Sequence, residues 1–280
     1  MKSKDELAAE QAAYWNGPGG KMWLAAYDRI QQGITGFSRI VLEAAQAKAG
    51  ERVLDVGCGT GATTAELAQA VGAGGHVLGV DISETLVGAA RAQKLANATF
   101  EVGDAARFPF TGQSFDLVFS RFGVMFFADP VAAFENLRRA LKPGGRLTFI
   151  CWRTPQENPW GAVPMRAALP FLPPMERPRP EDPGQYSFGD RGRVERILNQ
   201  AGFAGLSIEP VDQMLNQGKD IPDVLDRIGQ FGPLARAFKD AAPEQVAKAK
   251  AAIGEALKPY AAADGVKLAG ACWLVRARAS

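Results

Sequence analysis

Three glycines at alternate positions, Gly57, Gly59 and Gly61, follow a short apolar run in the sequence. Such a run, ended by a glycine-rich turn, is typical of a buried parallel strand that leads into a nucleotide-type site. Glycine suits the turn because its backbone reaches conformations that a Cβ forbids, and because bare peptide groups can contact a ligand. A helical stretch begins near residue 62, so its N-terminus points toward the same place. We therefore expect the chemistry of the protein here.

Two acidic residues end the next two predicted strands. Asp81 comes 20 positions after Gly61, and Asp104 follows the third strand. Ligands of an open parallel sheet bind outside the carboxyl ends of its strands, where these residues meet. An ionised Asp only accepts hydrogen bonds, so Asp81 suits two neighbouring ribose hydroxyls. Asp104 could accept a hydrogen bond from an exocyclic amino group, and Ile82 offers an apolar surface for a purine.

The spacing of the glycines separates two kinds of cofactor. The sequence has Gly-x-Gly-x-Gly, whereas the phosphate loop of dinucleotide-binding proteins has Gly-x-Gly-x-x-Gly. A nicotinamide-dependent oxidoreductase on a similar sheet is therefore disfavoured, and the sequence shows no evident Tyr and Lys pair to donate a proton. A third alternative is a protein that binds its cofactor without catalysis, since a fold does not guarantee activity.

The elements that must position these residues alternate between strand and helix. An amphipathic helix is predicted over 37–49, ending at Gly50, and Ser83 is a plausible N-cap for a later helix. Repeated strand, helix, strand units require right-handed crossovers and a parallel sheet. The predicted strands are 52–56, 77–80, 99–102, 115–119 and 145–151, and the helices between them are 62–71, 84–95 and 131–141.

We expect one α/β domain over residues 1–280, with a doubly wound, Rossmann-like sheet of mostly parallel strands. Residues 37–152 form its cofactor-binding core. A proline-rich segment, 153–188, and an Ala-rich helical segment, 218–265, are expected to be insertions that cap the substrate. The remaining segments, 189–217 and 266–280, complete the sheet, and the last strand, over 268–277, is antiparallel.

Composition narrows the class of protein. The chain has 32 basic and 30 acidic residues, and arginines and acids interleave over 176–196. This mixture does not favour a nucleic-acid partner. Three distant cysteines form neither a disulfide framework nor a metal site, which favours a reducing cytoplasm. No apolar stretch is long enough for stable membrane insertion. The protein is expected to act on a small molecule, as a monomer or a homodimer.

The stretch from Val53 to Gly61 resembles the cofactor loop of class I S-adenosylmethionine-dependent methyltransferases. Asp81 resembles their ribose-binding acid, and Asp104 and Ala105 their adenine-side pair. Residues 115–120 and 141–147 are similar to later strands of the branch that includes the ubiquinone and menaquinone C-methyltransferases. The likeness covers residues 37–152 and implies a seven-stranded sheet, S-adenosylmethionine as cofactor, and methyl transfer to a small molecule through an O, N or C acceptor.

The resemblance also implies which residues bind the cofactor. Ser120 and Arg121 lie where the family holds the methionyl amino group, although Arg121 could instead bind an acidic substrate or an internal carboxylate. Cys58, inside the glycine loop, suits packing better than nucleophilic attack. The implied cofactor-binding residues are Asp55, Gly57, Cys58, Gly59, Gly61, Asp81, Ile82, Asp104, Ala105, Ser120 and Arg121.

Residues 1–36 form an N-terminal segment that either closes as a lid or anchors itself on the core. Trp15 and Trp23 flank a Gly/Pro-rich turn and could contact a ligand together with Phe126. If the reaction needs a base, Tyr14, Tyr27 or a carboxylate of the cap could serve, and the sequence does not choose among them. The sole histidine, His76, comes before the second strand, away from the strand carboxyl ends.

The acceptor is expected to be moderately lipophilic. The fourth strand ends in Ser120-Arg121-Phe122-Gly123 and lacks the Asn/Asp-Pro-Pro-Tyr signature of enzymes that methylate exocyclic or amide nitrogens. Five aromatic residues could line an apolar cavity or belong to the core, and the second alternative is favoured for each: Phe126, Phe127, Trp152, Trp160 and Phe171.

Overall fold

The computed structural model describes residues 2–175, 179–230 and 232–279. Three helices precede the sheet: α1 (Lys4–Asn16), α2 (Pro18–Ala25) and α3 (Tyr27–Ala45). The predicted bounds of 37–49 for the third helix were wrong at both ends. It ends where Gln46 adopts left-handed backbone angles, before Gly50. It begins ten residues before the predicted start, and in these added turns Gln31 accepts a hydrogen bond from Arg121, a contact that local sequence pattern does not reveal.

The sheet has the predicted doubly wound, mostly parallel architecture. Its strand order is β3-β2-β1-β4-β5-β8-β6, and a two-residue strand, β7, pairs with β8. The first five strands in this order are parallel, and β8 runs antiparallel to β5 and β6 as predicted for the last strand. The strands are β1 (Arg52–Val56), β2 (His76–Asp81), β3 (Ala98–Val102), β4 (Phe115–Arg121), β5 (Leu141–Trp152), β6 (Phe203–Gly218), β7 (Ala261–Ala262) and β8 (Gly265–Ala279).

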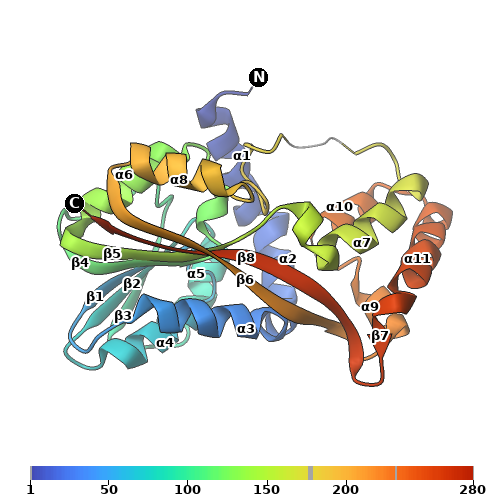
Figure 1. Ribbon diagram of the computed structural model, residues 1–280, viewed down its shortest axis with the longest axis horizontal. Coiled ribbons are helices and arrows are strands. Elements are labelled where there is room, and N and C mark those ends of the chain that lie inside the picture. The colour runs from blue at the N-terminus through green and yellow to red at the C-terminus, as the bar shows by residue number, and fades with distance from the viewer. Residues whose placement is uncertain (1, 176–178, 231, 280) are drawn as a thin grey trace.

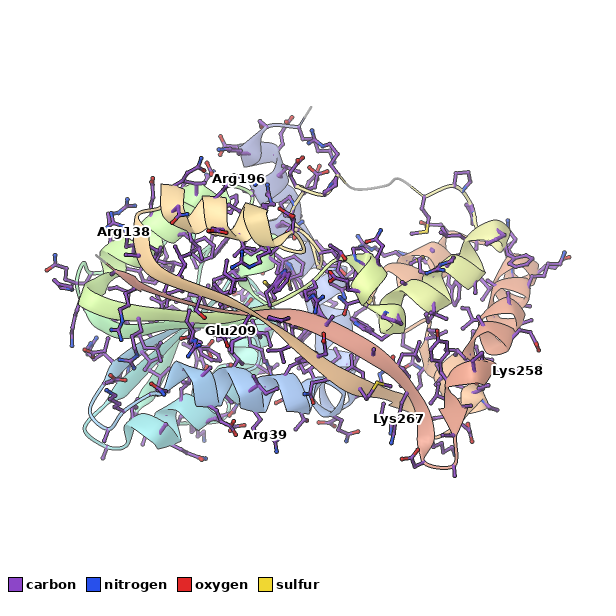
Figure 2. The ribbon with its side chains drawn as sticks, viewed as in Figure 1. Arg39, Arg138, Arg196, Glu209, Lys258 and Lys267 are labelled. Atoms are coloured by element: carbon purple, nitrogen blue, oxygen red, sulfur yellow. The ribbon has the colours of Figure 1, made fainter. Side chains whose placement is uncertain are left out.

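Helices cover both faces of this sheet (Figure 1). The right-handed crossovers place α4 (Ala62–Val71) and α5 (Glu84–Arg91) on the face that α3 covers. On the opposite face lie α6 (Pro130–Ala140) and α8 (Arg191–Gln200). The Arg138 guanidinium of α6 donates to the Ala201 carbonyl at the end of α8 (Figure 2). The helix α5 ends at Arg91, four residues before its predicted end.

Capping hydrogen bonds mark the starts of α5 and α6, and the first of them confirms the predicted N-cap Ser83. The Ser83 hydroxyl accepts from the backbone N–H of Leu86, and the Asp129 carboxylate accepts from that of Ala132. Each cap satisfies an N–H group that has no partner inside its helix.

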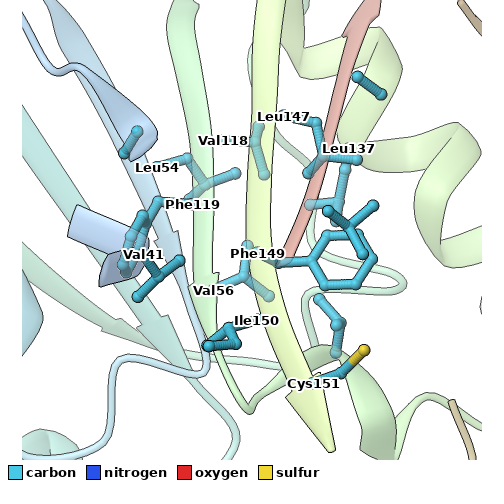
Figure 3. Close-up of a cluster of buried hydrophobic side chains, with 14 of the residues drawn as sticks. Val41, Leu54, Val56, Val118, Phe119, Leu137, Leu147, Phe149, Ile150 and Cys151 are labelled. Atoms are coloured by element: carbon cyan, nitrogen blue, oxygen red, sulfur yellow. The ribbon is translucent and has the colours of Figure 1, made fainter. Parts of the chain in front are cut away.

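The main core fills the space between the sheet and its helices (Figure 3). Side chains of a strand alternate between the two faces. Phe149 of β5 therefore packs on the side of α6, where Leu137 lies, whereas Phe119 of β4 packs on the side of α3, where Val41 lies. All four side chains are fully buried. This core fixes the carboxyl ends of β1, β4 and β5 relative to one another.

A second apolar cluster lies beyond the ends of β6 and β8, on the right in Figure 1. These two long strands extend out of the main sheet and carry the helices that build it. Within its described residues, the proline-rich segment contributes one α-helix, of ten residues, and two short 3-10 helices. Residues 176–178 lie outside the described residues. The helices are α7 (Pro159–Ala168), α9 (Ile221–Arg227), α10 (Gly232–Lys239) and α11 (Pro243–Leu257).

Candidate functional site

The glycine loop lies where the strand order of the sheet reverses, between β1 and β4. Gly57, Gly59 and Gly61 all have positive φ angles, of 68°, 55° and 85°. A Cβ on Gly57 would lie 2.7 Å from the Cα of Gly123, so the backbones that leave β1 and β4 touch each other. Glycine is favoured at these positions because other residues are strained at positive φ. The loop is therefore a bare-backbone surface at the point where open α/β sheets bind ligands.

Asp81 joins this loop to the turn that follows β2. Its Oδ2 accepts the Gly59 backbone N–H at 2.8 Å, and its Oδ1 accepts the Ser83 N–H at 2.9 Å. Burial raises the pKa of Asp81 above its ordinary value, although these N–H groups oppose the rise. Asp81 is surrounded by protein on most sides, but part of its surface remains accessible to solvent. A carboxylate that keeps accessible surface can accept further hydrogen bonds from a ligand.

Asp55 is a fully buried acid at the end of β1. Its Oδ2 accepts the hydroxyls of Thr63 and Thr64 at 2.8 and 2.7 Å, while its Oδ1 has no hydrogen-bond partner among the residues described. Burial raises the pKa of Asp55 to about 6, against the two threonine hydrogen bonds and the positive charge of Arg121. A buried carboxylate oxygen without a partner is costly unless a ligand supplies one.

Arg121 ends β4 on the face that carries Asp55. Its Nη1 donates to Gln31 Oε1 at 2.8 Å and to Ser38 Oγ at 2.7 Å, both on α3. Burial lowers the pKa of Arg121, and Asp55, Tyr27 and Glu66 oppose this effect. Like Asp81, the residue lies deep but keeps accessible surface. Its neighbours on α3 were missed in the sequence because no local pattern pairs residues this far apart.

The Ser120 hydroxyl forms hydrogen bonds within the protein. It donates to the Val56 carbonyl at 2.7 Å and accepts the Gly123 N–H at 3.2 Å. It therefore ties the end of β4 to the end of β1, and only the backbone of Ser120 remains for other contacts.

The other predicted cofactor residues surround the same edge of the sheet. Asp104 follows β3, and its Oδ1 accepts the Ala106 N–H at 2.9 Å. Ala105 is buried, and its carbonyl accepts from Asn136. The Cys58 thiol packs in a small cluster under α5, and burial raises its pKa well above the ordinary value. That thiol is therefore protonated at neutral pH and unsuited to nucleophilic attack, as its sequence context indicated.

The N-terminal helices lie against this edge. The nearest atom to the position of a Cβ on Gly59 is Trp23 Nε1, at 3.9 Å. Trp15 packs edge-on against Phe126, with ring centroids 5.1 Å apart, and against Trp23 at 6.0 Å. At its start α1 is held by ion pairs from Lys4 to Asp129 and from Asp5 to Arg107. The three aromatic residues singled out in the sequence thus form one cluster beside the glycine loop.

The candidate bases lie in different places. Tyr27, at the start of α3, is near enough to Arg121 to oppose the lowering of the Arg121 pKa. Tyr14 instead faces α10, where the Arg236 guanidinium lies 5.2 Å from its ring centroid. His76 begins β2 at the opposite end of the sheet, and its Nε2 lies 2.9 Å from Thr99 Oγ1. No cluster of three or more potential metal ligands occurs within the described ranges.

A row of aromatic rings in contact leads from the end of β4 toward the second cluster. Phe122 lies parallel to Trp152 at 4.7 Å, and Trp152 contacts Trp160 of α7 at 4.9 Å. Phe122 has a φ of 64°, which is strained for an aromatic residue and marks the turn beside Gly123. Of the five proposed cavity residues, Phe127 and Trp152 are buried, whereas Phe126, Trp160 and Phe171 keep accessible surface.

A shallow depression of about 460 Å³ lies at the amino ends of the strands, lined in part by Arg52, Phe115 and Lys142. It is remote from the glycine loop, because parallel strands carry their two ends to opposite edges of the sheet. The acids and glycines described above do not line it.

A doubly wound sheet with a glycine loop and three acids at its carboxyl edge defines an α/β protein that binds a nucleotide-type cofactor. The methyltransferase domain family matches residues 47–169. The demethylmenaquinone methyltransferase of Staphylococcus saprophyticus is 31% identical over 199 residues, which cover 65% of this chain and 84% of the relative. That of Beutenbergia cavernae is 32% identical over 178 residues, covering 61% and 72%.

Solved structures share the fold. The YcgJ protein of Bacillus subtilis has a TM-score of 0.57 at 16% identity, with 86% of this chain and 97% of that chain covered. Phosphoethanolamine N-methyltransferase 2 of Haemonchus contortus, in complex with S-adenosyl-L-methionine, has a TM-score of 0.52 at 22% identity, with 88% and 53% covered.

The chain belongs to the class I S-adenosylmethionine-dependent methyltransferases. It is an enzyme, and its cofactor is S-adenosylmethionine. The resemblance seen in the sequence is thereby confirmed, and the nicotinamide-dependent and non-catalytic alternatives are not supported.

Proposed function

We propose that this methyltransferase acts on a small, moderately lipophilic molecule that binds between the carboxyl edge of the sheet and the second cluster. The observation that carries the proposal is the aromatic row of Phe122, Trp152 and Trp160, in which the first two rings are buried and Trp160 of α7 keeps accessible surface. The similarity to enzymes named demethylmenaquinone methyltransferases supports the same class of acceptor. Whether the accepting atom is O, N or C depends on the substrate.

The residues of the site fit the cofactor. The glycine loop would contact its methionyl part, because no Cβ projects from Gly57, Gly59 or Gly61. Asp81 would accept from the two ribose hydroxyls, and Ile82, Asp104 and Ala105 would surround the adenine. The unpartnered Oδ1 of Asp55 lies in a buried site that favours a nearby positive charge. The backbone of Ser120 and the guanidinium of Arg121 would complete the methionyl end.

When bound, S-adenosylmethionine supplies an activated methyl group on a positively charged sulfur. This chain would contribute orientation and the exclusion of water, which together lower the barrier of a displacement reaction. Tyr27 is better placed than Tyr14 to accept a proton, because it lies near Arg121 at the carboxyl edge, whereas Tyr14 packs against Arg236. Neither the orientation of the substrate nor the acceptance of its proton by a tyrosine requires a metal ion.

We assign residues 1–36 as an N-terminal lid, with Trp15, Trp23 and Phe126 at its contact with the site. The segments 153–188 and 218–265 would cap the substrate. The lid and the cap meet where Arg29 Nη1 donates to Gln230 Oε1 at 2.9 Å and where Arg236 covers Tyr14. The boundary at residue 36 falls inside α3, so the lid is continuous with the first helix of the core.

Surface charge supports a small acceptor rather than a nucleic acid. Arg179, Arg191 and Arg196 each form an ion pair with a neighbouring acid, which leaves a mixed surface, and Arg177 lies outside the described residues. No helix within the described residues has the length and apolar character needed to cross a bilayer. Cys58, Cys151 and Cys272 are free and buried, which agrees with a reducing, cytoplasmic location.

Incubation with methyl-labelled S-adenosylmethionine and a fractionated metabolite extract tests the acceptor class. We expect the label in a low-mass product that partitions into an organic solvent. Label that appears only in protein or nucleic acid would contradict the proposal.

A further inference from the structure

The carboxamide of Asn16, at the end of α1, uses all of its hydrogen-bonding groups. Its Nδ2 donates to the Ala12 carbonyl at 3.0 Å and to the Ile82 carbonyl at 2.9 Å, and its Oδ1 accepts the Glu84 N–H at 3.0 Å. Two of these bonds reach the turn after β2, 66 and 68 positions along the chain. An amide that satisfies a carbonyl and an N–H of one turn fixes the geometry of that turn.

Two further residues hold the lid against the same turn. The Ser83 hydroxyl donates to the Trp15 carbonyl at 2.8 Å. Gly20, in the first turns of α2, is buried so closely against Trp15 and Ser83 that a Cβ would collide with both. The small residue therefore permits the approach of α2, and Asn16 and Ser83 direct it.

These contacts form a continuous ring with the cofactor residues. The turn to which Asn16 is hydrogen-bonded follows directly after Asp81. The Asp81 carboxylate accepts the Ser83 and Gly59 N–H groups. Trp23, eight residues after Trp15, comes back to Gly59. The lid thus touches both structures that Asp81 connects, the turn after β2 and the glycine loop.

We propose that Asn16 is a positioning residue for methyl transfer, which docks the lid on the turn after β2 and so couples lid closure to cofactor binding. This inference rests on the proposed function of Asp81 and of the lid. Its consequence is that S-adenosylmethionine leaves the site at a rate that depends on the hydrogen bonds of Asn16, which reaches the proposed cofactor residue Ile82 through the Ile82 carbonyl.

The sharpest variant is Asn16→Asp, which keeps size and the acceptor for Glu84. It removes the donor to the Ile82 carbonyl and places a negative charge against that oxygen. The matched control is Asn97→Asp, because Asn97 Nδ2 also donates to two backbone carbonyls, of Ala68 and Gly72, both at 2.8 Å but remote from the lid. Gly20→Ala should displace the lid by a different contact, the close packing of α2 against Trp15 and Ser83. It replaces Asn16→Asp as the test if that variant folds poorly.

Two readouts separate positioning from stability. The dissociation rate of S-adenosylmethionine, followed by stopped-flow tryptophan fluorescence, is expected to rise about tenfold in Asn16→Asp and to be unchanged in Asn97→Asp. Trypsin cleavage after Lys21, in α2, is expected to become faster in Asn16→Asp alone and to slow when the cofactor is added. Both variants are expected to lower the melting temperature.

A wild-type dissociation rate in both Asn16→Asp and Gly20→Ala would overturn the inference, whatever the change in melting temperature. An equal rise in Asn97→Asp would also overturn it, because the effect would then follow stability alone. If the wild-type enzyme binds no S-adenosylmethionine at all, the proposed function fails first and the inference with it.

Discussion

The carboxylate of Asp81 accepts the backbone N–H of Gly59 at 2.8 Å, so the end of β2 and the glycine loop after β1 share one hydrogen bond. This contact places an acid beside a surface of bare backbone, at the switch point of the sheet. The two halves of the proposed cofactor site are therefore not independent.

Replacing Asp81 with Asn should weaken S-adenosylmethionine binding by roughly ten- to a hundredfold, since hydrogen bonds to a charged acceptor contribute about 1.5–3 kcal/mol. An Asn side chain also cannot accept both N–H groups that Asp81 accepts now. Calorimetric titration measures the change. Asp116→Asn is the control, because Asp116 likewise accepts a backbone N–H, from Arg52, but at the opposite end of the sheet. Equal affinities in the wild type and Asp81→Asn would refute the ribose assignment.

Asp55 should make the cofactor-free enzyme less stable as the pH rises. Its pKa is about 6 in the folded protein and 3.8 in the unfolded chain. Between these values the folded state binds the proton and the unfolded state does not, so the stability falls with increasing pH. The penalty is fully present above pH 6 and amounts to about 3 kcal/mol, at 1.36 kcal/mol per pH unit.

Asp55→Asn should therefore melt at a higher temperature than the wild type at pH 8, with the difference shrinking toward pH 4. Its oxygen can still accept from Thr63 and Thr64. The same variant should bind S-adenosylmethionine more weakly, because the buried negative charge is lost. Scanning calorimetry at several pH values checks the first result, and a difference in melting temperature that stays constant with pH would disprove the raised pKa.

Gly57→Ala should destabilise the fold by about 2–5 kcal/mol, from left-handed strain together with overpacking. The added methyl group would press on the Cα of Gly123 and separate the ends of β1 and β4. Gly144→Ala is the matched control, because Gly144 has a φ of 73° but nothing within 4 Å of its Cβ position. It should cost only about 1–2 kcal/mol. Urea unfolding compares the two, and similar costs would mean that the close approach contributes nothing.

Trp23 should report cofactor binding by its fluorescence, because its indole lies beside Gly59. Addition of S-adenosylmethionine should change the tryptophan emission of the wild type, and Trp23→Phe should lose most of that change. In Trp273→Phe the change should persist, since Trp273 lies on β8, away from the loop, where its indole N–H donates to the Gly189 carbonyl. A full response in Trp23→Phe would argue against contact between the lid and the cofactor.

Much of the fold could be predicted because its signals are local. The apolar run before Gly57 defines β1, and Ser83 and Asp129 define helix starts through their own side chains. The contacts that were missed join distant segments. Asn16 reaches Ile82, and Arg121 reaches Gln31, in the part of α3 that was not predicted. The positive φ of Phe122 was also hidden, because tertiary packing imposes it on a residue that disfavours it.

A crystal structure with bound S-adenosylhomocysteine tests the central claim, the position of the cofactor, most directly. The account predicts the ribose hydroxyls at the carboxylate of Asp81, the adenine beside Asp104, and the amino acid end over the glycine loop near Arg121. The account would be contradicted if the ligand were found instead at the amino ends of the strands, in the depression lined by Arg52, Phe115 and Lys142.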